Sequence, residues 1–323
     1  MLDPWAETEG SLTAKRAVGQ GPVPIPPVGP ALQTTFDADE IVTSAPPVVR
    51  VAPNPPPAHR GRVSTRPLSP SSASPTDLDL SSVEKLADLP NDARVSFARR
   101  AVVKELARND EASNFALALV LEGSVEVAAT IVDSPAFRLD AGAVLRGRGT
   151  IHSITPIRLV AATDHARVAT WDERAVADAF RSCPWIEDDL RIAGNRTQAL
   201  VGVTMGALGE RLDPVLRGTV TNRMRLRVLA EYEVFARAGA PIPGLLVVGG
   251  GELELVGKTG VPTGAILRAG DFLFPNEVLR AAPAPNSVRA AKGGAIILVA
   301  ERGITHELLV TCPPLLELFA DGA

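Results

Sequence analysis

The sequence predicts a mainly β protein made of two tandem modules, each a small antiparallel sandwich or barrel with helices at its ends. The first observation is a repeat, because residues 117–127 and 245–255 share one pattern of apolar run, glycine and alternating strand. Gly142 and Gly270 then follow the two copies at the same distance. A repeat of domain length indicates tandem modules, since solenoid periods are about 20–50 residues. The second observation is that the apolar runs are too short for a parallel βαβ sheet.

Composition agrees with two ordinary domains and limits the functions available to them. The chain has 323 residues, of which 46% are hydrophobic and only 4% aromatic, so its cores must be built from aliphatic side chains. A net charge of −4 gives no general attraction to nucleic acid or to anionic membranes. We find no secretory signal pattern and no apolar run of about 18 residues, and we therefore expect a cytoplasmic protein without a membrane span.

Residues 1–78 differ from the rest and are predicted to be a disordered tail. About half of the 28 prolines lie here, in runs such as 22–27 and 53–57 and in the Ser/Pro-rich stretch 69–75. Proline fixes φ and removes hydrogen-bond donors, so the segment favours extended polyproline II. It is interpreted as an inert linker or as a docking segment for a partner that binds polyproline.

The first module is expected over residues 79–208. Apolar spacing predicts a helix over 92–107, and glycine-broken runs predict strands at 115–121, 124–132, 143–145 and 157–162. Thr170 and Glu173 have the spacing of a capping box, which starts a helix that Pro184 stops. A further helical pattern, weakened by glycines, covers residues 185–209.

The second module, residues 209–323, repeats this order. A helix is expected at 211–226, strands at 245–248, 252–256, 264–267, 272–274 and 295–300, and a short helix at 303–311. A run of five arginines crosses this region and is interpreted as a solvated helix face, with a phosphate or partner contact as the alternative; they are Arg211, Arg217, Arg223, Arg225 and Arg227. Cys183 and Cys312 occupy equivalent positions in separate modules, and we expect two small buried side chains without a disulfide.

The two modules resemble the cyclic-nucleotide-binding domain, a β jelly roll with an N-terminal helical piece and two C-terminal helices. The residues that carry the likeness in the second copy are 227–239, 244–255 and 267–274, and in the first copy 117–127, 139–144 and 171–184. The resemblance implies two tandem jelly rolls with flanking helices. It also implies a phosphate cassette, in which backbone amides, a glutamate and an arginine hold a cyclic nucleotide.

The cassette that the resemblance places in the second copy departs from the family pattern. Glu277 matches the ribose-binding glutamate, but the preceding glycine is replaced and Asn276 is inserted. Asn286 stands where the phosphate arginine belongs, and Arg289 comes three residues late. The candidate ligand-binding residues are Gly270, Phe274, Asn276, Glu277, Asn286, Ser287 and Arg289.

The first copy has no acidic residue at the ribose position. Its candidates for an anion are Arg146, Arg148 and Arg158, with ordinary surface arginines as the alternative. The last helix of the family usually closes over the base, whereas here the sequence stops after residues 313–319, and we expect that helix to be truncated. The resemblance therefore implies a retained fold with degenerate ligand binding.

The sequence shows no sign of catalytic or metal chemistry. The histidines are scattered without a His-x-His pair, and serine-nucleophile, phosphate-loop and dinucleotide motifs are absent. The histidines are His59, His152, His165 and His306. We expect neither a metal nor a cofactor, and no enzyme.

The first functional hypothesis is a non-enzymatic regulatory or scaffolding protein that binds a protein partner through its barrel surfaces or its Pro-rich tail. The alternative is a sensor whose second copy binds cyclic AMP, cyclic GMP or a related phosphate ligand. A third hypothesis is that the modules target a larger assembly with the tail as a tether. A DNA-binding regulator is disfavoured, since no helix-turn-helix follows the second module.

Overall fold

The computed structural model describes residues 78–152, 155–257 and 260–321. The predicted disordered tail, apart from Leu78, and His59 lie outside the described residues. The described residues all belong to one compact unit. Within the described residues, no helix is both long and apolar enough to cross a membrane.

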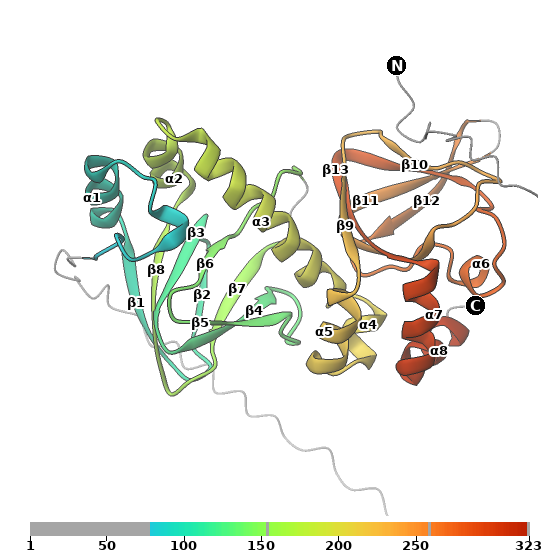
Figure 1. Ribbon diagram of the computed structural model, residues 1–323, viewed down its shortest axis with the longest axis horizontal. Helices are drawn as coiled ribbons and strands as arrows, with labels where there is room; N and C mark the ends of the chain where they lie inside the picture. Colours follow the sequence, from blue (N-terminus) through green and yellow to red (C-terminus); the bar gives the residue numbers. More distant parts are fainter. Residues whose placement is uncertain (1–77, 153–154, 258–259, 322–323) are drawn as a thin grey trace, which may run out of the picture. The chain divides into compact units, whose positions relative to one another are not determined.

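The first copy is an antiparallel β sandwich with helices before and after it (Figure 1). One sheet has the order β1-β8-β3-β6 and the other the order β2-β7-β4-β5. The bounds of its elements are η1 Glu84–Leu86, α1 Asn91–Arg99, β1 Val102–Ala107, β2 Glu111–Ser113, β3 Leu117–Glu122, β4 Ser124–Ala129, β5 Phe137–Asp140, β6 Val144–Arg146, β7 Ile157–Ala161, β8 His165–Trp171 and α2 Glu173–Phe180.

The second copy builds the same two faces from longer strands. One face consists of the start of β11, the end of β13 and β9, and the end of β13 pairs with both other strands. The other face consists of the end of β11, the start of β13, β10 and β12. Here the end of β11 pairs with β12 and with the start of β13, which also pairs with β10. The bounds are β9 Arg225–Leu229, β10 Val234–Ala236, β11 Gly244–Val256, β12 Pro262–Arg268, α6 Pro275–Leu279 and β13 Ser287–Glu301. The shared strand order confirms the prediction of tandem jelly rolls.

The remaining helices are α3 Pro184–Val203, α4 Ala207–Arg211, α5 Pro214–Asn222, α7 Arg302–Thr311 and α8 Pro313–Asp321. α3 contacts β4 and β6 of the first copy as well as β9, β11 and β13 of the second. Helix α8 is present although we expected almost no helix there; its Leu315 and Phe319 are fully buried. The division into modules at residue 208 stays a prediction.

The sandwich interiors are mainly aliphatic, as the composition indicated, and three aromatic side chains, Phe97, Trp171 and Phe180, form one cluster. Trp171 stacks on Phe97 with ring centroids 4.5 Å apart. Its indole N–H donates to the Phe97 carbonyl at 2.8 Å. This contact ties α1 to the end of β8, where α2 begins.

The helix predicted over 92–107 was wrong in its second half. α1 ends at Arg99, and residues 102–107 form β1, which pairs along its whole length with β8. Val102 and Leu106 fit a helical period, but β-branched Val102 and Val103 also favour a strand. Pairing with a strand some 60 residues later decides between the two.

Two further local predictions were wrong. Thr170 lies in β8, and Asp172 caps α2 by accepting a hydrogen bond from the Ala175 N–H at 2.7 Å. The arginine run is divided between α4, α5, the turn after α5 and β9, and Arg217 is buried. Cys183 and Cys312 are confirmed as free, buried side chains.

Candidate functional site

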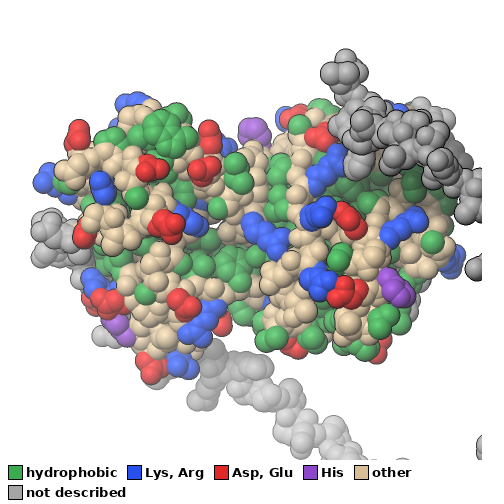
Figure 2. Space-filling view, viewed as in Figure 1, with side chains coloured by type: hydrophobic (Ala, Val, Ile, Leu, Met, Phe, Trp, Pro, Cys, Tyr) green, Lys and Arg blue, Asp and Glu red, His purple; other side chains and the backbone are tan. Residues whose placement is uncertain are grey.

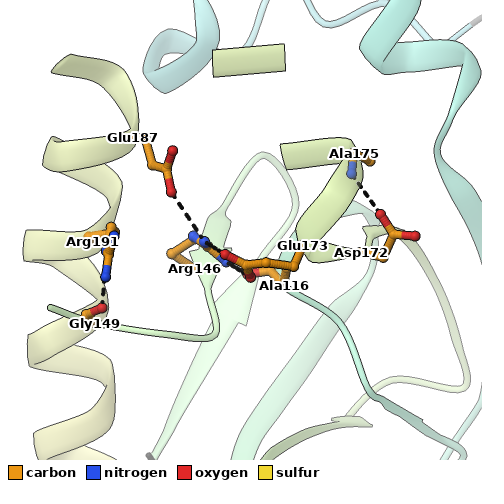
Figure 3. A network of polar contacts seen from close by, with 8 residues as sticks. All are labelled: Ala116, Arg146, Gly149, Asp172, Glu173, Ala175, Glu187 and Arg191. Atoms are coloured by element: carbon orange, nitrogen blue, oxygen red, sulfur yellow. Dashed lines mark hydrogen bonds and ion pairs between the residues drawn. The ribbon is translucent and has the colours of Figure 1, made fainter. Parts of the chain in front are cut away.

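The described part of the first-copy cassette is residues 147–152 and 155–156, which follow Arg146 at the end of β6. The Arg146 side chain is only 1% exposed, so the alternative of an ordinary surface arginine is wrong for this residue. Its Nη1 donates to the Ala116 carbonyl at 2.8 Å, and Nη1 and Nη2 bond the two oxygens of Glu173 at 3.0 and 2.6 Å (Figure 3). Glu187 of α3 lies 3.5 Å from Nη2.

Two carboxylates therefore compensate the charge of Arg146. Hydrogen bonding from Arg146 holds the pKa of Glu173 below its usual value, which keeps that carboxyl ionised. A bidentate guanidinium–carboxylate pair of this kind is a strong interaction. Arg146, which the sequence suggested as a phosphate-binding residue, thus links β6 to α2 and α3 through ion pairs.

Two side chains of helix α3 bind two of the backbone amides of this cassette. Gln198, which is completely buried, accepts from the Thr155 N–H at 2.8 Å and donates to the carbonyls of Gly147 and Thr155 at 2.6 and 3.1 Å. Asn195 accepts from the Thr150 N–H at 2.8 Å. Amides of a cassette loop are what a phosphate requires, and here two side-chain carbonyls of α3 already bind them.

The close approach of α3 to the loop depends on glycine. A Cβ atom at Gly194 would lie 2.3 Å from the Arg148 carbonyl oxygen, so any side chain there would force the helix and the loop apart. The Arg191 Nε also donates to the Gly149 carbonyl at 3.2 Å. The glycine that weakened the helical pattern in the sequence is the residue that lets α3 close this loop.

The other two first-copy candidates take no part in binding Glu173 and Glu187. Arg158 is on β7 and forms ion pairs with Glu111 at 2.5 Å and Asp133 at 2.7 Å. Arg148 is exposed and lines a cavity of about 320 Å³ together with Glu173. The structure does not bring Arg146, Arg148 and Arg158 to one site.

In the second copy, the residues of the cassette entrance are largely structural. Gly270 has φ of +95°, and a Cβ there would lie 2.4 Å from the Gly206 nitrogen. Phe274 is 7% exposed within the core and has φ of 56° at the start of α6. Asn276 and Glu277 are half-buried on this one-turn helix.

Glu277 and Arg289 line different cavities. Glu277 lines one of about 230 Å³ with Arg302 and His306 of α7. Arg289 lines one of about 520 Å³ with Ser287, Arg237 and the strand residues Val234, Val256 and Val288. Asn286 lines neither of these two cavities. The expected glutamate and arginine of one nucleotide site are therefore separated.

Arg289 is engaged on the outer face of the sheet. It forms an ion pair with Glu254 at 2.8 Å, and its guanidinium carbon lies 5.5 Å from the ring centroid of Tyr232. Ser287 accepts a hydrogen bond from the Ala238 N–H at 3.0 Å. The neighbouring Arg237 is exposed and has no ion pair among the residues that the structure describes.

Sequence reasoning missed Asn195, Gln198 and Glu173 at the first cassette and Arg237 at the second. Asn195 and Gln198 stand three residues apart on α3 beside buried Leu190 and Ala199. Polar residues at helical spacing on the apolar face of a helix are the signal that would have identified them.

Charges on the visible surface are mixed rather than segregated. Figure 2 shows acidic and basic side chains interspersed across the face, without a broad region of one sign. In the described part of the chain, no group of three or more His, Cys, Asp or Glu side chains is placed to hold a metal ion.

No model of a known protein family matches the sequence, and no curated protein matches it. Solved structures with a similar chain trace include the regulatory domain of Toxoplasma gondii PKA with cAMP, which is 14% identical with a TM-score of 0.34, covering 74% of this chain and 92% of that chain. The regulatory subunit of a cAMP-independent protein kinase A from Trypanosoma brucei is 13% identical with a TM-score of 0.34, covering 74% and 84%. The catabolite activator protein of Thermus thermophilus is 18% identical with a TM-score of 0.33, covering 35% and 55%.

Both copies have a cyclic-nucleotide-binding-like fold. In the first copy, strands β1 to β8 follow α1 and precede α2 and α3, which is the element order that the resemblance implied. A shared fold does not determine what a site binds, so the side chains must decide function.

Proposed function

We propose that this chain is a non-enzymatic regulatory or scaffolding protein whose jelly rolls act as protein-binding or packing modules. The observation that carries the proposal is the closure of the first cassette by Asn195 and Gln198 of α3. We place the protein in the cytoplasm, with a protein partner bound through the barrel surfaces or the Pro-rich tail.

A nucleotide that entered the first cassette would have to displace this closure. Each buried group left without a partner costs about 1–3 kcal/mol, and a ligand must replace every bond it breaks. Arg146 is also not available to a phosphate, because its charge is compensated by Glu173 and Glu187. Ligand binding there is thus degenerate.

The test is a thermal-shift series on the full chain with cyclic AMP, cyclic GMP and cyclic dinucleotides at millimolar concentration. We expect no saturable rise in the melting temperature. The double variant Asn195→Ala, Gln198→Ala exposes the loop amides and serves as the comparison. A saturable rise in the unmodified chain that is lost in Arg148→Ala would contradict closure of the first copy.

A nucleotide sensor in the second copy is the second candidate, because Ser287, Arg289 and Arg237 share the cavity of about 520 Å³. Ligand at a hundredfold excess over its dissociation constant would stabilise the chain by about 2.7 kcal/mol. This function predicts a shift that Arg289→Ala abolishes. The control Arg268→Ala, which breaks a similar pair with Glu252 at 3.3 Å, should retain it.

The partner proposal is tested by affinity capture with the full chain and with a chain lacking residues 1–78. Recovery of one protein by both chains would assign binding to the barrels, and recovery only by the full chain would assign it to the tail. Fluorescent localisation of the same two chains tests the third hypothesis, in which the tail tethers the modules to an assembly.

A further inference from the structure

Arg217 of α5 reaches the loop between β4 and β5. Its Nη1 donates to the Ser134 hydroxyl oxygen at 3.1 Å and to the carbonyls of Leu212 and Gly209 at 3.2 and 3.4 Å. Its Nη2 donates to the carbonyl of Pro135. One guanidinium thus connects residues 134–135 of the first copy to the helices that precede the second.

Arg217 is a buried cation without a carboxylate at ion-pair distance. It is 2% exposed, and among the described residues no Asp or Glu forms an ion pair with it. The nearby Asp213 carboxylate is used to cap α5, where it accepts from the N–H groups of Val215 and Leu216. Buried charges in proteins are usually paired, because an uncompensated charge is costly to remove from water.

The Nε of Arg217 is also buried without a hydrogen-bond partner. Other arginines share this feature, but Arg146, Arg158 and Arg167 each have a carboxylate within ion-pair distance. Arg94 also shares it, but the Arg94 residue is only half-buried. The charge of Arg217 is therefore compensated only by the attraction of Asp213, which forms no ion pair with it. A dianion on the Ser134 oxygen would place a direct charge partner beside Nη1.

Ser134 lies in a loop whose neighbouring side chains are exposed. The preceding Asp133 side chain is fully exposed, and Ile131 of the same loop is 73% exposed. Ser134 is half-buried and is followed by Pro135. The Asp133 carboxylate lies 2.7 Å from Arg158, so its negative charge beside Ser134 is already compensated.

We propose that Ser134 is a phosphorylation site and that Arg217 binds the phosphate. In a serine/threonine kinase, the Ser134 oxygen attacks the γ-phosphorus of a nucleoside triphosphate and the bond to the departing diphosphate breaks. The hydroxyl proton passes to a base of the kinase. The phosphoserine bears a charge of about −1.5 to −2 at pH 7 and three strong acceptor oxygens. By binding Arg217, the phosphate holds the β4–β5 loop against α5. This modification is independent of any ligand in either cassette.

The experiment installs phosphoserine at position 134 of the full chain by amber suppression. Ser82, which is exposed and has no hydrogen bond to another described residue, receives phosphoserine in the matched control. Phosphorus NMR titration should show a second phosphate pKa below the ordinary value of about 6 at position 134 but not at position 82. The melting temperature should rise only with phosphoserine 134.

Arg217→Lys tests the receptor, because lysine keeps the charge but lacks the planar fork of donors. We expect the rise in melting temperature and most of the phosphate pKa shift to disappear in this variant. If phosphoserine 134 titrates like phosphoserine 82 and lowers the melting temperature, the proposal is wrong, whether or not Arg217→Lys folds. Peptide mass spectrometry on protein from its native cells should find phosphate on Ser134, and its absence across growth phases would also overturn the proposal.

Discussion

Replacing Gln198 by alanine should open the first cassette. The side chain is completely buried and makes bonds of 2.6, 2.8 and 3.1 Å to the backbone of Gly147 and Thr155. Each lost bond is worth about 0.5–1.5 kcal/mol net, and a stranded buried group costs about 1–3 kcal/mol. Water can reach part of this loop, since Thr150 is exposed. We therefore expect the free energy of unfolding to fall by about 2–4 kcal/mol.

Guanidinium denaturation measures this loss as a lower midpoint at unchanged slope. Native-state hydrogen exchange provides a local readout, because the Thr155 amide should lose protection while amides in β8 keep theirs. Asp189→Ala, an exposed change on the same helix, is the matched control. A loss below about 0.5 kcal/mol, as for an ordinary surface substitution, with the Thr155 amide still protected would refute the closure.

Three more substitutions test the packing and charge that surround this site. Because Arg146 lowers the pKa of Glu173, the pair stabilises the fold above the unfolded pKa of about 4.3 and loses this contribution as pH falls through the lower folded value. The difference in stability between the unmodified chain and Glu173→Gln should therefore be present at pH 7 and vanish in acid. Gly202→Ala places a Cβ 2.0 Å from the Gly249 carbonyl oxygen and should destabilise by about 3 kcal/mol or more in chemical denaturation. Gly218→Ala, with open space in α5, should stabilise by about 0.5–1 kcal/mol, and equal effects at the two glycines would contradict the packing of α3 on β11.

Much of the fold was predictable because its signals are local. The glycine between β3 and β4 and the apolar alternation of β4 appear in both copies, and the predicted strand at 157–162 is β7, Ile157–Ala161. The predicted helix at 303–311 is α7, Arg302–Thr311. Residues 102–107 were not predictable in this way, because a six-residue apolar pattern fits a helix as well as a strand until its pairing partner is known.

The candidate site was predictable only as a set of residue types. The sequence identified Arg146 as a cation at the cassette, but not that Glu187, some 40 residues later, lies 3.5 Å from it. It identified Glu277 and Arg289 as a possible pair, and the structure places them in separate cavities. Whether such residues meet depends on which faces of α3, α6 and β13 turn inward.

By itself, the sequence determined that the chain contains two related β modules whose cassettes depart from the family pattern, because repeats, turn glycines and missing motif residues are properties of short segments. Only the tertiary structure showed that α3 closes the first cassette and that Arg217 reaches Ser134. Each of these two contacts joins residues that are far apart in the chain. Their burial and charge compensation arise only when the helices pack. The physical reason is that a buried polar group must find its hydrogen-bond or ion-pair partner among the groups that packing of the apolar core brings next to it.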